Sequence, residues 1–180
     1  MEIKQETLET ERLILRPLDL NDANANAVQK FAGNYNIAKT TVNIPHPYED
    51  GMAEEWISLQ EKRWTDEDLV NFAIIKKQTD QLIGVVGLVG RKEHEGGIGY
   101  WIGEPFWRNG YCTEATKALI DFCFKNLNID RLEAEYLVTN PASGRVMEKA
   151  GMTFEGTKTI KDRDGDDAQL NVYEIYKNRN

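Results

Sequence analysis

The stretch from Glu104 to Ala115 constrains the fold most, because it lies between a strand-like run and a helix-like run. The preceding run, residues 98–102 (Ile-Gly-Tyr-Trp-Ile), is rich in β-branched and aromatic residues, as strands are. The following run places its apolar residues at the spacing of a helix with one buried face, at Ala115, Ala118, Leu119 and Phe122. The sequence therefore predicts a strand, a tight loop and a helix in direct succession.

The start of this predicted helix is suited to bind an anion. The first backbone N–H groups of a helix have no partner within it and carry partial positive charge, so phosphates bind there. We expect Thr113 to cap the first turn, Gly110 to adopt a positive φ and Cys112 to keep the loop free of bulk. The loop has neither of the best-known phosphate-binding patterns, Gly-x-x-x-x-Gly-Lys and Gly-x-Gly-x-x-Gly. An ordinary strand-to-helix connection is therefore the alternative.

Length and charge limit the classes of protein to which the chain can belong. Its 180 residues suit a single domain over residues 1–180, with residues 1–9 polar and expected to fray. The net charge of −8 argues against a nucleic-acid partner and favours a cationic one. No apolar run is long enough to span a membrane, and no signal peptide opens the chain. We therefore expect a cytoplasmic protein with no membrane partner.

Periodicity along the whole chain predicts a mixed α+β layer. The expected strands cover residues 12–16, 72–75, 82–89, 98–102, 132–138, 152–161 and 170–177. The expected helices cover residues 22–31, 49–64, the segment after Thr113 and residues 141–151, the last beginning at Pro141 and ending at Gly151. Residues 34–48 have no clear period and are expected to form a loop.

Three motifs in the chain resemble one known family. Residues 107–115 (Trp-Arg-Asn-Gly-Tyr-Cys-Thr-Glu-Ala) resemble the acetyl-CoA pyrophosphate loop of the GNAT superfamily of N-acetyltransferases. They are most similar to the branch that acetylates the N-terminal alanine or serine of ribosomal proteins. Residues 10–17 (Thr-Glu-Arg-Leu-Ile-Leu-Arg-Pro) and residues 140–152 resemble two further motifs of that branch, in the same order. The loop departs from the superfamily pattern at Trp107, usually Gln or Arg, and at Cys112, usually Gly or Ala.

The resemblance implies the GNAT fold, with a central mixed sheet of about seven strands flanked by four helices. In that family the sheet splays between its fourth and fifth strands, and the pantetheine arm of acetyl-CoA lies in the gap. The resemblance, together with the positive charges nearest in sequence, implies contacts with acetyl-CoA by Tyr100, Trp101, Ile102, Arg108, Asn109, Gly110, Tyr111, Cys112, Thr113, Asn140, Ser143, Arg145 and Lys149.

The implied reaction is direct attack of an amine on the thioester, which requires no metal. A free α-amine has a pKa near 8 and a lysine amine one near 10, so either must lose a proton near neutral pH. Glu104, at the end of the central strand, is the first candidate for the catalytic base. A solvated loop acid is the alternative reading of Glu104, and Glu133, Glu135 or a water chain are the other candidate proton routes.

A second catalytic group is needed to protonate the leaving thiolate. Ser143 resembles the serine that the ribosomal-protein branch places near the cofactor sulfur, although a first-turn serine can equally bond its own backbone. Tyr136 is the other possible donor. Asn140 resembles the asparagine that binds the pantetheine arm, with an Asx turn before Pro141 as its alternative role.

The acceptor amine is not specified by the sequence. The resemblance points to a protein N-terminus, and a polyamine, an amino acid or an aminoglycoside are the alternatives. The first two helices and the last hairpin are expected to select it. Tyr48, Trp56, Trp64 and Trp101 are candidates for an apolar wall there, with a place in the core as the alternative for each. A turn is expected at Asp164 and Gly165. Related enzymes often dimerise, so a homodimer is possible.

Two other classes of protein compete with this interpretation. A cysteine at a helix N-terminus can have a lowered pKa and act as a nucleophile, which would make Cys112 catalytic. The chain has only two histidines, His46 and His94, to assist it, and both fall in predicted loops. The second competitor is a non-catalytic module that binds acyl-CoA without turning it over.

Overall fold

The structure, a computed structural model, describes residues 6–65 and 69–177. Within these ranges one eight-stranded sheet has the order β1-β2-β3-β4-β5-β6-β8-β7. Its strands are β1 (Leu8–Glu9), β2 (Leu13–Pro17), β3 (Val70–Lys76), β4 (Gln81–Lys92), β5 (Glu95–Ile102), β6 (Arg131–Leu137), β7 (Thr153–Lys161) and β8 (Asp167–Tyr176). Strands β5 and β6 pair in parallel, and every other neighbouring pair is antiparallel.

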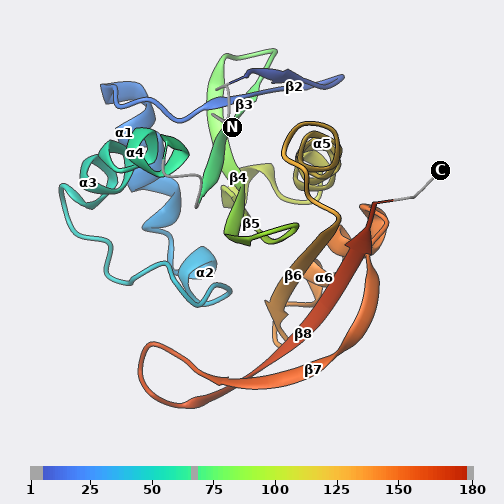
Figure 1. Cartoon of the computed structure of the whole chain (residues 1–180). Coiled ribbons are helices and arrows are strands. Elements are labelled where there is room, and N and C mark those ends of the chain that lie inside the picture. Colours follow the sequence, from blue (N-terminus) through green and yellow to red (C-terminus); the bar gives the residue numbers. More distant parts are fainter. Residues whose placement is uncertain (1–5, 66–68, 178–180) are drawn as a thin grey trace.

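Helices cover both faces of the first half of the sheet (Figure 1). They are α1 (Asp22–Ala32), α2 (Tyr35–Ala38), α3 (Met52–Ser58), α4 (Gln60–Thr65), α5 (Tyr111–Asn126) and α6 (Pro141–Lys149), with the 3₁₀ turn η1 (Glu104–Phe106). Helix α5 packs on one face over a core that includes Phe72 and Leu119. Helices α1 and α3 pack on the other face through a second cluster that includes Val28 and Ile57. The predicted α+β layer is confirmed.

Strand ends differ from the prediction by at most three residues, as at β5, which begins at Glu95 rather than Ile98, and the elements differ from the prediction at four further places. The short strand β1 adds an eighth strand within the segment that we expected to fray, of which residues 1–5 lie outside the described ranges. Helix α2 forms within the predicted loop 34–48 because the side chain of Asn34 accepts a hydrogen bond from the Asn36 backbone N–H and caps it. The helix after the central loop begins at Tyr111 rather than after Thr113, so the predicted capping role of Thr113 is wrong.

The predicted single helix 49–64 consists of the two helices α3 and α4, interrupted at Leu59. The hydroxyl of Ser58 donates to the carbonyl of Glu55, and the amide of Gln60 donates to the carbonyl of Trp56. Side-chain donors that bond nearby carbonyls compete with the helical backbone ladder. With α2, this interruption raises the helices of the described ranges from the expected four to six.

The last helix agrees with the sequence-based prediction at both ends. Helix α6 begins at Pro141 and ends at Lys149, and Gly151, whose φ is 94°, follows the C-cap residue Ala150. The closing hairpin also forms, and Gly165 takes a positive φ of 86° at its tip. The carboxylate of Asp162 accepts from the backbone N–H groups of Asp164 and Asp166, which fixes the expected turn.

Candidate active site

The sheet splays at the place where the resemblance located the cofactor gap. Strands β5 and β6 pair only from Glu95 with Arg131 to Ile98 with Ala134. Beyond that point β5 continues to Ile102 and β6 to Leu137 without pairing with each other. The backbone groups of both strands therefore face a wedge between them, whose open end lies beside η1 and the start of α6.

The loop after β5 is held in one shape by its own side chains. The indole Nε1 of Trp107 donates to the carbonyl of Ile102 at 2.6 Å, and the amide of Asn109 donates to the carbonyls of Phe106 and Trp107. Arg108 and Gly110 both have positive φ, at 63° and 79°. No side chain caps the start of α5. The first-turn N–H groups of α5 are thus left to bind a ligand.

The amino-terminal motif meets this loop through one ion pair. Arg12 forms a salt bridge with Glu114 in the first turn of α5, with Nε and Nη2 each 2.7 Å from Oε2. The other carboxylate oxygen accepts from Thr10 Oγ1 at 2.6 Å and from the Arg12 backbone N–H at 2.8 Å. Both motifs were identified in the sequence, but this contact was not predicted, because the two residues lie about one hundred positions apart.

Tyr100 and Ser143 pair on the side of the wedge where α6 begins. The Tyr100 hydroxyl donates to the Ser143 carbonyl at 3.0 Å and lies 2.9 Å from Ser143 Oγ. Either hydroxyl can be the donor in the second contact. Ser143 therefore bonds a side chain from β5 and does not cap its own helix. Burial and the nearby Cys112 raise the pKa of Tyr100 far above its usual value, so Tyr100 stays protonated.

Tyr136 lies against α6 next to this pair. A Cβ added at Gly144 would come within 2.6 Å of the Tyr136 hydroxyl, so α6 approaches β6 this closely only because residue 144 is glycine. The Tyr136 hydroxyl accepts a hydrogen bond from Asn171 at 2.9 Å. The two candidate donors, Ser143 and Tyr136, are thus next to each other.

Glu104 lies at the β5 side of the open end, in η1. Its Oε2 accepts from Asn34 Nδ2 at 2.6 Å and its Oε1 from Asn36 Nδ2 at 3.0 Å. These two hydrogen bonds lower the pKa of the Glu104 carboxyl, so Glu104 is ionised at neutral pH. Neither asparagine was predicted, because nothing in the local pattern of residues 34–48 indicates a distant partner.

Residues 34–44 run from Glu104 to the opposite side of the open end, and we call this segment the strap. Asn140 Nδ2 lies 3.5 Å from the carbonyl of Thr40 and makes neither an Asx turn nor a cap. Arg163, at the tip of the β7–β8 hairpin, donates to the carbonyls of Ala38 and Ile44. The strap therefore contacts η1, the residue before α6 and the tip of the closing hairpin.

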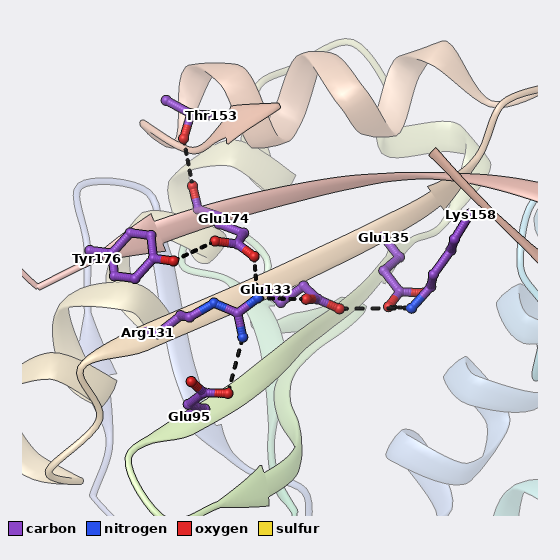
Figure 2. A network of polar contacts seen from close by, with 8 residues as sticks. All are labelled: Glu95, Arg131, Glu133, Glu135, Thr153, Lys158, Glu174 and Tyr176. Carbon is purple, nitrogen blue, oxygen red and sulfur yellow. Dashed lines mark hydrogen bonds and ion pairs between the residues drawn. The ribbon is translucent and has the colours of Figure 1, made fainter. Parts of the chain in front are cut away.

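The other candidate bases lie in an ion-pair network on β6. Figure 2 shows Glu133 between Arg131 and Lys158, and Glu135 against Lys158. Arg131 also pairs with Glu95 and Glu174. Burial and the neighbouring Glu135 raise the pKa of Glu133. Both carboxylates already have cationic partners, whereas Glu104 is held by neutral amides.

Side chains of the candidate apolar wall separate into two groups. Trp64 is 2% exposed and packs edge-on against Phe72, so it lies in the core and not in the wall. Tyr48, Trp56 and Trp101 are each partly buried and pack against the α1–α3 cluster. Trp101 thus lies on the opposite face of β5 from Tyr100, while Ile102 is buried in the core with α5.

The remaining predicted cofactor contacts lie at the surface around α5 and α6. Arg108 and Asn109 are exposed in the loop, Tyr111, Cys112 and Thr113 are partly buried in the first turn, and Arg145 and Lys149 are exposed one turn apart on α6. Burial raises the pKa of the Cys112 thiol to about 12, which contradicts the lowered pKa that a catalytic cysteine would need.

Two observations concern metals and membranes. Among residues 6–65 and 69–177 no three His, Cys, Asp or Glu side chains gather as metal ligands, and the metal-free reaction stays a prediction. Over the same ranges, every helix is too short or too polar to cross a membrane.

Comparison with known proteins agrees with this geometry. Residues 12–153 match the family described as "Acetyltransferase (GNAT) domain". The chain is 30% identical to the uncharacterized N-acetyltransferase p20 of Bacillus licheniformis, over 95% of this chain and 93% of p20.

Two solved structures have the same fold. The microcin C7 self-immunity acetyltransferase MccE, in complex with acetyl-CoA and AMP, superposes with a TM-score of 0.84 at 20% identity, over 97% of this chain and 98% of that one. The ribosomal-protein-S5-alanine acetyltransferase of Vibrio fischeri gives 0.81 at 19% identity, over 95% and 96%. The family match covers most of the chain, and the splayed sheet and the loop before α5 agree with it. The chain therefore belongs to the GNAT family of N-acetyltransferases.

Proposed function

We propose that this N-acetyltransferase moves an acetyl group from acetyl-CoA to a primary amine by direct attack, with Glu104 on the proton route and Ser143 as donor to the thiolate. The observation that carries the proposal is the wedge between β5 and β6, with Glu104 at one side of its open end and Ser143 at the other. Acetyl-CoA supplies the thioester, and the residues of this chain bind it, orient it and move protons.

The residues present fit such a ligand. The uncapped first turn of α5 offers backbone N–H groups to the pyrophosphate. Arg108, Arg145 and Lys149 add exposed positive charge that an anionic ligand needs on a chain of net charge −8. The unpaired edges of β5 and β6 offer backbone groups to the amides of the pantetheine arm, and Asn140 would exchange its weak contact with Thr40 for that arm.

Glu104 suits a proton route to solvent. Its carboxylate is ionised and only partly buried, and the Asn34 and Asn36 amides hold it at the open end. An ammonium group that enters beside it is attracted and can lose its proton to it, directly or through water. The Ser143 hydroxyl, held by Tyr100, lies across the wedge, where a thiolate would form.

The acceptor site is assigned to the strap, the aromatic group of Tyr48, Trp56 and Trp101, and the β7–β8 hairpin. A protein N-terminal amine is the proposed acceptor, on the basis of the sequence resemblance, and the Vibrio fischeri neighbour is a ribosomal-protein-S5-alanine acetyltransferase. A small-molecule amine is the alternative, because fold similarity does not determine substrate.

A panel assay tests this function. The purified protein is mixed with acetyl-CoA and short peptides with N-terminal Ala or Ser, spermidine, an amino acid or an aminoglycoside. Amine-dependent thiol release, with a gain of one acetyl group by mass, is expected for one class. If acetyl-CoA binds but no amine is modified, the non-catalytic acyl-CoA module replaces the proposal.

A further inference from the structure

We propose that Arg12, the residue before β2, is a positioning residue of the loop between β5 and α5, which we call the cofactor loop. Arg12 holds the peptide between Asn109 and Gly110 in the orientation that binds pyrophosphate. The proposal rests on the proposed use of acetyl-CoA and extends that site to a segment outside the wedge.

Contacts with Glu114 and Tyr111 hold the Arg12 side chain in place. Its guanidinium makes two contacts of 2.7 Å with one oxygen of Glu114, and it lies over the Tyr111 ring with 4.7 Å from Cζ to the ring centroid. The Glu114 side chain is only 16% exposed and is held in turn by Thr10. A planar guanidinium held on an edge and a face has little freedom left.

The remaining donor of this group sets the orientation of the loop. Arg12 Nη1 donates to the carbonyl of Asn109 at 2.9 Å. In a trans peptide the C=O and the following N–H point in opposite directions. A carbonyl turned toward Arg12 therefore directs the Gly110 N–H away from it. The same contact keeps a carbonyl oxygen, which repels phosphate, bonded to a cation.

Electrostatics gives the ion pair a second effect on the same site. Glu114 is in the first turn of α5, where an uncompensated carboxylate would repel a bound pyrophosphate. Partial burial raises the pKa of Glu114, but the hydrogen bonds from Thr10 and Arg12 outweigh this effect and lower the pKa overall. The carboxylate therefore stays ionised and paired. Arg12 thus neutralises the one acidic side chain of the first turn.

The test compares CoA with pantetheine, which lacks the pyrophosphate. For Arg12→Gln we expect the Kd for CoA, measured by calorimetry, to rise at least about tenfold, because the loop peptide and Glu114 both lose their partner. The affinity for pantetheine, measured by ligand-observed NMR, should not change. Arg12→Lys keeps the positive charge but lacks the planar guanidinium with its several donors, and it should give a smaller rise in the Kd for CoA.

Lys77→Gln is the matched control, because Lys77 pairs with Glu9 and the Thr10 carbonyl on the same edge without touching the loop. It should leave both affinities unchanged. Wild-type affinity for CoA in a folded Arg12→Lys or Arg12→Gln variant would overturn the inference alone, as would an equal loss for CoA and pantetheine. Failure of the unmodified protein to bind CoA would overturn the proposed function as well.

Discussion

The cofactor loop follows β5 and the strap crosses the open end of the same wedge, and the two segments are built in different ways. Within the cofactor loop, residues 107–110 are held by the bonds from Trp107 and Asn109 to carbonyls two to five residues away, together with one bond from the distant Arg12. The strap of residues 34–44 is fixed by Glu104, Asn140 and Arg163, which lie about 70 to 125 positions further along the chain. A loop with a mostly local structure suits the cofactor, which is the same in every reaction of the family. A strap held by distant residues suits the acceptor amine, which differs between enzymes.

This difference predicts which kinetic constant each substitution changes. Substitutions in the cofactor loop should weaken the binding of acetyl-CoA. Substitutions in the strap and in the residues that hold it should weaken the binding of the amine. Glu104 belongs to both regions, because it follows β5 and holds the strap, so it should affect the chemical step.

Glu104→Gln should have the largest effect. We expect kcat to fall about 100-fold or more, because a neutral amide cannot take up a proton. Binding of acetyl-CoA, measured by calorimetry, should stay the same. Glu155→Gln, at an exposed acid of β7, is the control. A kcat within a few-fold of the unmodified enzyme would transfer the role to Glu133, Glu135 or water.

Gly110→Val should have the next largest effect, confined to the cofactor. A β-branched residue at a φ of 79° costs about 1–3 kcal/mol, so the Kd for acetyl-CoA should rise roughly 10- to 100-fold. Gly156→Val in β7, where an added Cβ meets nothing within 4 Å, is the control. Unchanged affinity would show that this backbone turn does not contact the cofactor.

Asn36→Ala should shift the pH dependence. Asn36 is the largest cause of the lowered pKa of Glu104, so its removal raises that pKa. Because the ionised carboxylate is the active form, the acidic limb of kcat/KM should move to higher pH, with activity lost first at low pH and recovered at high pH. A pH–rate series on both proteins measures the shift, and identical acidic limbs would contradict the role of Glu104.

Arg163→Ala should have a smaller effect, confined to the acceptor. Without its bonds to the carbonyls of Ala38 and Ile44, the strap loses its contact with the hairpin, and the KM for the amine should rise several-fold. The KM for acetyl-CoA should not change. Lys161→Ala, which removes an exposed ion pair with Asp167 in the same hairpin, is the control. An equal rise in both KM values would contradict the assignment of the amine to the strap and of acetyl-CoA to the cofactor loop.

Cys112→Ala should have the smallest effect. The Cys112 thiol has a pKa of about 12, so it is not ionised near neutral pH, and we expect kcat within about twofold of the unmodified enzyme. Steady-state rates at saturating acetyl-CoA measure this. Complete loss of activity in a folded variant would restore the thiol mechanism.

The sequence could predict the features that depend on neighbours. The positive φ of Gly110 and the end of α6 shortly before Gly151 follow from local patterns, and both occur. The positions of Asn34, Arg12 and Arg163 could not be predicted, since their partners are fixed only when the sheet brings distant segments together. Thr113 shows the limit of local reasoning, because a good capping residue lies two positions inside a helix that begins after a glycine.

Initial-rate kinetics with both substrates varied tests the central claim most directly. Direct attack requires acetyl-CoA and the amine to be bound together across the wedge, so reciprocal plots at several amine concentrations should intersect. Parallel lines, the pattern of a covalent acetyl-enzyme, would contradict the account and return Cys112 to the reaction.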